Sequence, residues 1–126
     1  MSIYKNLIGG EWIEGADVNR NMNPSDLSDM VGEYARADAK QALQAIAAAR
    51  AAFPAWSRGN IQARADMLEA IGNEILARKD ELGDLLAREE GKTLPEGIGE
   101  AARAGQIFKF FAAQRRHEYT QFRNIL

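Results

Sequence analysis

The stretch KDELGDLLAREEGKTLPEGIGE, residues 79–100, decides most of the fold because one helix ends and another begins within it. Apolar residues at helical spacing predict a helix over residues 79–90. Gly91 follows at the position of a left-handed C-cap glycine. Pro95 suits the first turn of a further helix, which we expect to reach about Arg115. The apolar residues of the first of these helices are Leu82, Leu85 and Leu86.

Two earlier helices are predicted upstream of this stretch. Asp38 can cap the first, whose apolar face is formed by Ala42, Ile46, Ala49, Phe53 and Trp56. Pro54 lacks an amide hydrogen, so we expect it to kink or end that helix near Phe53. The break falls at residues 58–60, and Asn60 can cap the second helix. The face of the second helix comprises Ile61, Leu68, Ile71 and Ile75, with Arg64 as the polar exception.

The first third of the chain is β-strand and turn in character. Leu7-Ile8 and Trp12-Ile13 flank Gly9-Gly10-Glu11, which is typical of a short hairpin. Residues 15–24 are rich in Gly, Asp and Asn and predict a connection made of turns. Met30–Ala35 is expected to be a strand. The predicted fold is therefore α+β and predominantly helical, with a short N-terminal β-hairpin and strands followed by about four helices.

Length and composition limit the classes of protein that the chain can represent. The 126 residues are enough for one modest domain, and 46% hydrophobic with 27% charged residues is ordinary for a globular chain. A net charge of −2 gives no electrostatic reason to expect nucleic acid or an anionic membrane as a partner. No apolar run has membrane-spanning length and no signal peptide is evident, so we expect a cytoplasmic protein.

None of the candidate chemical motifs predicts a catalytic, cofactor-binding or metal site. The chain contains no cysteine and one histidine, His117, which is expected to lie on the surface. Gly9-Gly10 lacks the third glycine of a dinucleotide fingerprint. Gly91-Lys92-Thr93 resembles the end of a phosphate-binding loop, but Leu86 occupies the position of its upstream glycine. Adjacent acidic pairs such as Glu89-Glu90 and Asp80-Glu81 do not face each other on a helix.

Read in order, several segments resemble the N-terminal part of the NAD(P)-dependent aldehyde dehydrogenase family. The last of them is similar to the family pattern E-x-G-K-x-x-x-E-x-x-x-E. No single segment is specific, whereas their order and spacing over residues 7–112 are. The segments are Ile8–Trp12, Asn23-Pro24, Val31-Gly32, Ala42–Trp56, Arg64–Leu68 and Glu89–Glu100. The amino-acid sequence of the last segment, Glu89–Glu100, most resembles that of bacterial 2,5-dioxovalerate (α-ketoglutarate semialdehyde) dehydrogenases.

This resemblance implies oxidation of an aldehyde, with 2,5-dioxopentanoate as a candidate, to a carboxylic acid. In the family a cysteine thiolate forms a thiohemiacetal, an amide stabilises the oxyanion, a glutamate activates water, and NAD or NADP accepts the hydride. All of these groups lie beyond the part of the family that residues 1–112 match. No catalytic or cofactor residue is carried over, and the chain alone is expected to bind no cofactor and to be inactive.

From Ala113 onward the sequence departs from the family pattern. We therefore divide the chain into residues 1–112, the N-terminal segment of an aldehyde dehydrogenase-like domain, and residues 113–126, a divergent tail. A frameshift or premature end is the preferred interpretation, with a deliberately shortened chain or a genuine short protein as alternatives. The expected partners are the remainder of the dehydrogenase, homologous subunits, or further copies through self-association. The competing hypotheses are a stand-alone helical interaction module that associates with dehydrogenase subunits, and an oxidoreductase completed in trans.

Overall fold

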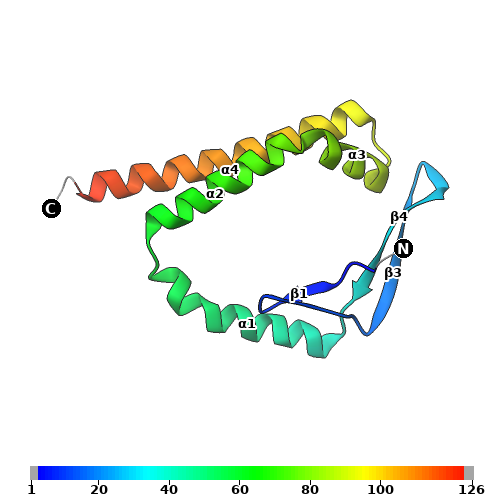
Figure 1. Ribbon diagram of the computed structural model, residues 1–126, viewed down its shortest axis with the longest axis horizontal. Helices are drawn as coiled ribbons and strands as arrows, with labels where there is room; N and C mark the ends of the chain where they lie inside the picture. Colours follow the sequence, from blue (N-terminus) through cyan, green and yellow to red (C-terminus); the bar gives the residue numbers. More distant parts are fainter. Residues whose placement is uncertain (1–2, 124–126) are drawn as a thin grey trace. The chain divides into compact units, whose positions relative to one another are not determined.

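The computed structural model describes the backbone of residues 3–123 and the side chains of residues 3–114. The chain forms two compact units, Met1–Arg58 and Gly59–Leu126. The first unit contains strands β1 to β4 and helix α1, and the second contains helices α2 to α4 (Figure 1). The predicted α+β architecture with a short strand region and four helices is confirmed.

The first unit opens with the predicted hairpin. Strand β1 (Asn6–Ile8) pairs antiparallel with β2 (Glu11–Ile13), and Ile8 lies opposite Glu11. The two residues of the turn, Gly9 and Gly10, have φ values of 63° and 89°, a conformation that side chains disfavour. The glycine pair is therefore required by the turn itself.

The segment expected to be all turns is instead a strand, so that prediction was wrong. Strand β3 (Asp17–Asn23) pairs antiparallel with β4 (Asp26–Arg36), with a register irregularity near Met22. Ion pairs across the ladder link Arg36 to Asp17 at 2.7 Å and Arg20 to Glu33 at 3.1 Å. Cross-strand pairing thus outweighs the low strand propensity of Asn and Asp, and only Pro24-Ser25 between the strands forms a turn.

Tyr4 adds a short third segment beside β4. Its amide donates to the Glu33 carbonyl at 2.9 Å, and its carbonyl accepts from the Ala35 amide at 2.8 Å. The bridge is parallel, and the Tyr4 and Tyr34 rings stack with centroids 5.0 Å apart. The stacked pair anchors the segment around Tyr4 to the β3–β4 hairpin.

Helix α1 (Ala39–Ser57) begins where the sequence predicted. The Asp38 carboxylate accepts the Gln41 amide at 2.8 Å, which confirms the N-cap. The helix does not end near Phe53 but continues through Pro54 to Ser57. Pro54 falls in the last turn, and its carbonyl accepts from Ser57 Oγ at 3.3 Å and from Arg58 Nε at 3.0 Å. These side-chain hydrogen bonds help to hold the turn that the proline would otherwise weaken.

The second unit is a bundle of three helices with the predicted caps. Helix α2 (Ile61–Ala77) starts after Asn60, whose side chain accepts the Gln62 amide at 2.8 Å. Helix α3 (Lys79–Glu90) has the bounds that the sequence predicted. Helix α4 (Leu94–Arg123) extends beyond the expected end near Arg115. The polar composition of residues 113–123 therefore does not interrupt the helix.

Glycines allow the helices of this unit to approach closely. Helix α4 runs antiparallel to α2 and packs along it, and also packs against α3 (Figure 1). A β-carbon built on Gly83 of α3 would lie 2.5 Å from the Ile98 Cα of α4. One built on Gly105 would lie 2.7 Å from Leu76 Cγ of α2, and one on Gly72 would lie 2.9 Å from the Gly105 carbonyl oxygen. Both crossings thus depend on residues without a side chain.

The core is correspondingly thin. Among residues 3–114 the buried apolar side chains are those of Ala65, Ala101 and Ala112, and no large side chain there is fully buried. Many large aliphatic and aromatic side chains are exposed, among them several on the predicted apolar helix faces. On the helices these include Leu43, Ile46, Phe53, Trp56, Met67, Ile71, Leu85, Ile107, Phe110 and Phe111. As an isolated chain, each unit leaves much of its apolar surface in contact with water.

Candidate functional site

The connection between α3 and α4 contains the most motif-like sequence in the chain. Gly91 ends α3 in the left-handed conformation, with φ of 70° and ψ of 28°. Its amide donates to the Ala87 carbonyl at 2.9 Å, and the Lys92 amide donates to the same oxygen at 3.2 Å. This is the predicted glycine C-cap, and it reverses the chain direction between the two helices.

Lys92 joins the two sides of this connection. Its ammonium nitrogen lies 2.6 Å from a carboxylate oxygen of Glu90 and 2.7 Å from one of Glu100. Hydrogen bonds to Glu100 and then to Glu90 raise the pKa of Lys92 above its ordinary value. The side chain is held between the end of α3 and the second turn of α4, so it stabilises the connection.

Thr93 donates two hydrogen bonds to the Glu96 carboxylate at the start of α4. The Glu96 carboxylate accepts from Thr93 Oγ1 at 2.7 Å and from the Thr93 amide at 3.2 Å. The hydroxyl and then the amide lower the pKa of Glu96 below its ordinary value. The arrangement resembles a capping box, in which the glutamate at the third helical position satisfies the backbone donor of the cap residue.

The Gly91-Lys92-Thr93 sequence does not fit a phosphate group. A phosphate-binding loop follows a strand and presents free backbone amides, whereas here a helix precedes the glycine and all three amides donate within the chain. The Lys92 ammonium is bound by two carboxylates. The Gly9-Gly10 pair is a hairpin turn and likewise does not lead into a helix. Neither glycine segment therefore fits the pyrophosphate of a dinucleotide.

The acidic pair Asp80-Glu81, another candidate from the sequence, is engaged in ion pairs with neighbouring basic side chains. Glu81 accepts two hydrogen bonds from Arg78, at 2.6 and 2.9 Å, and this pairing lowers the pKa of Glu81. Asp80 pairs with Lys79 at 2.8 Å. Within the described part of the chain no group of three metal-ligating side chains converges, and no helix is long and apolar enough to span a membrane. The side chain of His117 lies outside the described residues.

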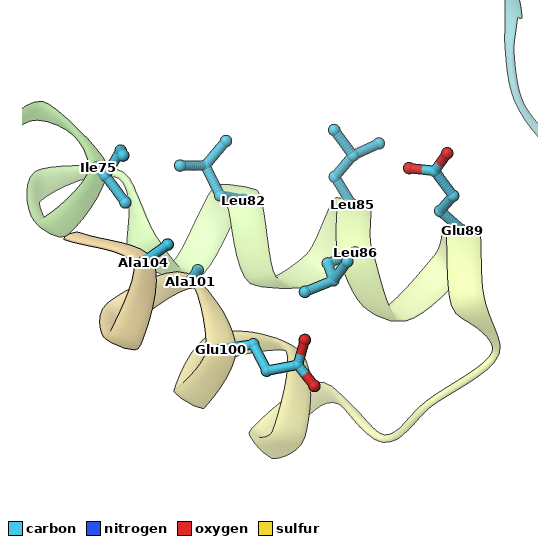
Figure 2. Close-up of a pocket in the computed structure, with 8 residues that line it drawn as sticks. All are labelled: Ile75, Leu82, Leu85, Leu86, Glu89, Glu100, Ala101 and Ala104. Atoms are coloured by element: carbon cyan, nitrogen blue, oxygen red, sulfur yellow. The ribbon is translucent and has the colours of Figure 1, made fainter. Parts of the chain in front are cut away.

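An apolar groove between α3 and α4 was not anticipated from the sequence. It has a volume of about 480 Å³ and is lined mainly by leucines of α3, alanines of α4 and Ile75 of α2, with Glu89 and Glu100 at its polar end. Figure 2 shows the side chains of Leu82, Leu85 and Glu89 along one side of α3, with Leu86 facing toward α4. The leucine spacing was visible in the sequence, but the glycines that fix how closely α4 approaches were not recognised as the packing residues.

Comparison with known proteins places the chain in a family. The sequence profile of the aldehyde dehydrogenase family matches residues 12–125, and the chain belongs to this family. It is 36% identical over 112 residues to an α-ketoglutarate semialdehyde dehydrogenase of Haloferax volcanii, covering 87% of this chain and 23% of the relative. It is 34% identical over 113 residues to the α-ketoglutaric semialdehyde dehydrogenase of Bacillus subtilis, again covering 23% of the relative.

Solved structures support the same assignment. The chain resembles an NAD-dependent aldehyde dehydrogenase from Sinorhizobium meliloti with a TM-score of 0.84 and 28% identity, covering 90% of this chain and 23% of the other. It also resembles a variant of Staphylococcus aureus betaine aldehyde dehydrogenase in complex with NAD+, with a TM-score of 0.82 and 28% identity, over 87% and 23% of the two chains. The predicted family and N-terminal correspondence are confirmed, and the stand-alone interaction module gains no support. The chain spans about a quarter of the length of these relatives.

Proposed function

We propose that residues 1–126 form the N-terminal scaffold of an aldehyde dehydrogenase that oxidises a semialdehyde, with α-ketoglutarate semialdehyde (2,5-dioxopentanoate) as the favoured substrate and NAD or NADP as hydride acceptor. The observation that carries the proposal is the family match over residues 12–125, combined with two α-ketoglutarate semialdehyde dehydrogenases among the relatives. Residues of this chain contribute helices and strands rather than reacting groups.

The chemistry of the sequence supports this division of roles. Aldehyde oxidation through a thiohemiacetal needs a thiolate nucleophile, and the chain has no cysteine. The carboxylates and amides of the most motif-like segment are engaged in helix capping and ion pairs. The nucleophile, the base and the dinucleotide site would therefore come from a part of the enzyme that this sequence does not contain.

The exposed apolar side chains support a scaffold role as well. Faces such as Ile107, Phe110 and Phe111 on α4 are about half exposed, and burial of each large apolar side chain stabilises by about 1.5–3 kcal/mol. Contiguous exposed apolar side chains are typical of surfaces that contact another protein segment. We propose the remainder of the dehydrogenase domain as the segment that covers these faces in the whole enzyme.

A chimera tests the proposal directly. The N-terminal region of the Bacillus subtilis relative that this chain matches would be replaced by the corresponding residues of this chain, and formation of NADH or NADPH from α-ketoglutarate semialdehyde would be measured. We expect the chimera to be active, and a matched variant of the relative that lacks the region to be inactive. A chimera that is insoluble, or folded but inactive beside an active unaltered relative, would contradict the proposal.

A further inference from the structure

The middle of helix α4 presents an apolar patch to water. Ile107, Phe110 and Phe111 are 48%, 58% and 55% exposed, and the two phenyl rings meet edge to face with centroids 5.4 Å apart. Two shallow hollows adjoin the patch, and both are lined by Ile107 and Phe111. The patch therefore offers protruding rings as well as recesses, which a contact between two identical surfaces requires.

The patch lies between two parts of the same unit that differ in charge. Residues 79–105, which comprise α3, the connection and the first turns of α4, contain seven acidic and four basic residues, for a net charge of −3. Helix α4 continues to Arg123, and residues 115–123 contain three arginines and one glutamate, for a net charge of +2. Ion pairs within residues 79–105 do not remove an excess of three carboxylates. The unit is thus acidic on the N-terminal side of the patch and basic on its C-terminal side.

Phe110 lies midway between the two charged parts along α4. Residues 115–123 begin five residues after Phe110, and residues 97–105 end five residues before it. In an antiparallel pair of α4 helices with a twofold axis at Phe110, residues 115–123 of each copy therefore lie beside residues 97–105 of the other. That stretch of α4 borders the apolar groove next to α3, which Ala101 and Ala104 line from the α4 side (Figure 2).

We propose that two copies of this chain form an antiparallel dimer through α4, in which the Ile107–Phe111 patches pack on each other and the basic residues 115–123 of each copy lie beside the acidic α3–α4 end of the other. All of these contacts belong to the unit Gly59–Leu126, so the dimer does not depend on where the first unit lies. Charge favours the antiparallel over the parallel pair, because a parallel pair brings like charges together. The inference concerns the 126-residue chain on its own and does not rest on the proposed dehydrogenase activity.

Single introduced cysteines test the antiparallel arrangement, because the chain has none of its own. Gln106 and Gln114 are exposed and lie four residues before and after Phe110. A mixture of Gln106→Cys and Gln114→Cys is expected to form a disulfide-linked heterodimer under mild oxidation. Each variant alone should cross-link weakly, because its two thiols lie about 12 Å apart along the helix axis. Gly99→Cys is the control for random collision, since nothing lies within 4 Å of a β-carbon built there and its two thiols would be about 33 Å apart.

Charge reversal tests the electrostatic contribution, with sedimentation velocity as the measurement and far-UV circular dichroism as a check on folding. The wild-type chain is expected to dimerise, and Arg115→Glu/Arg116→Glu is expected to weaken dimerisation roughly tenfold or more. Lys40→Glu is the matched control, because it reverses a basic residue of α1 in the other unit, and it should dimerise like the wild type.

Three results would overturn the proposal. One is a monomeric wild-type chain, which would leave the patch to a different occupant, such as the remainder of the dehydrogenase. The second is cross-linking of Gly99→Cys as efficient as that of the Gln106→Cys and Gln114→Cys mixture. The third is a folded Arg115→Glu/Arg116→Glu variant that dimerises like the wild type. If that variant does not fold, the cysteine mixture decides, because both glutamines are exposed and their replacement leaves the apolar patch intact.

Discussion

Replacing Gly83 by alanine should loosen the contact between α3 and α4. A β-carbon at this position would lie 2.5 Å from the Ile98 Cα and 2.6 Å from its backbone nitrogen, whereas ordinary contact begins at about 3.4 Å. The helices would have to separate by roughly 1 Å, since backbone atoms cannot rotate away. Overpacking of this kind costs about 1–3 kcal/mol, and contact with backbone favours the upper end.

Helix propensity acts in the opposite direction. Alanine is favoured over glycine inside a helix by about 1 kcal/mol, so the net cost of Gly83→Ala is about 2 kcal/mol. A loss of that size corresponds to about thirtyfold faster hydrogen exchange of the α3 amides if these exchange through local opening. Gly99→Ala is the matched control, because nothing lies within 4 Å of a β-carbon built there. This control should slow exchange slightly, through helix propensity alone.

The comparison of the two glycine variants can refute the packing argument. Equal exchange rates in Gly83→Ala and Gly99→Ala, or slower exchange in both, would show that α3 and α4 are not held at the close distance described. Faster exchange in Gly83→Ala alone would support it.

Three further outcomes are expected. Thr93→Ala should remove the hydrogen bond from the Thr93 hydroxyl to Glu96 and weaken the first turn of α4, measured as faster exchange of the α4 N-terminal amides with no change at the start of α2. Because the pKa of Glu96 is lowered in the folded chain, its contribution to helix stability is present above the ordinary value of 4.5 and is lost as the pH falls through the lowered value. Glu96→Gln keeps a hydrogen-bond acceptor without the charge, so this variant should flatten the acid dependence of helicity. The chain at low concentration should show weak near-UV dichroism and a broad thermal transition, because no large side chain among residues 3–114 is fully buried; sharp dichroism and a cooperative transition in a proven monomer would contradict this expectation.

The helices were predictable because their boundaries are encoded locally. Asp38 and Asn60 each accept a first-turn amide, and Gly91 adopts the left-handed conformation that ends α3. These signals depend on residues only a few positions apart, so sequence alone is sufficient to read them. The Gly9-Gly10 hairpin is local in the same sense.

The errors arose where distant residues decide the structure. Strand β3 looked like a series of turns because its partner β4 and the Asp17–Arg36 pair cannot be seen in its own composition. Helix α4 continues past Arg115 although the apolar period stops there. The Leu and Ile rows are visible in the sequence, but it does not show that the helices cross at glycines such as Gly83 and Gly105, where small residues are buried and large ones stay exposed. Periodicity identifies a face but does not say what packs against it.

The predicted absence of catalytic and cofactor residues stays a prediction, and so does the division at residue 113. The family match extends to residue 125, and the described helix α4 runs to Arg123. Both observations describe how far the family match and the helix extend, and neither tests catalysis or cofactor binding. An activity measurement is therefore the direct test of what these residues contribute.

That measurement is aldehyde-dependent formation of NADH or NADPH by the purified 126-residue chain, with α-ketoglutarate semialdehyde as substrate and the active Bacillus subtilis relative as positive control. If the chain is a scaffold without reacting groups, no turnover is expected with either cofactor, because a chain without cysteine has no thiolate to form the thiohemiacetal. Turnover that persists through repeated purification and requires only this polypeptide would contradict the account.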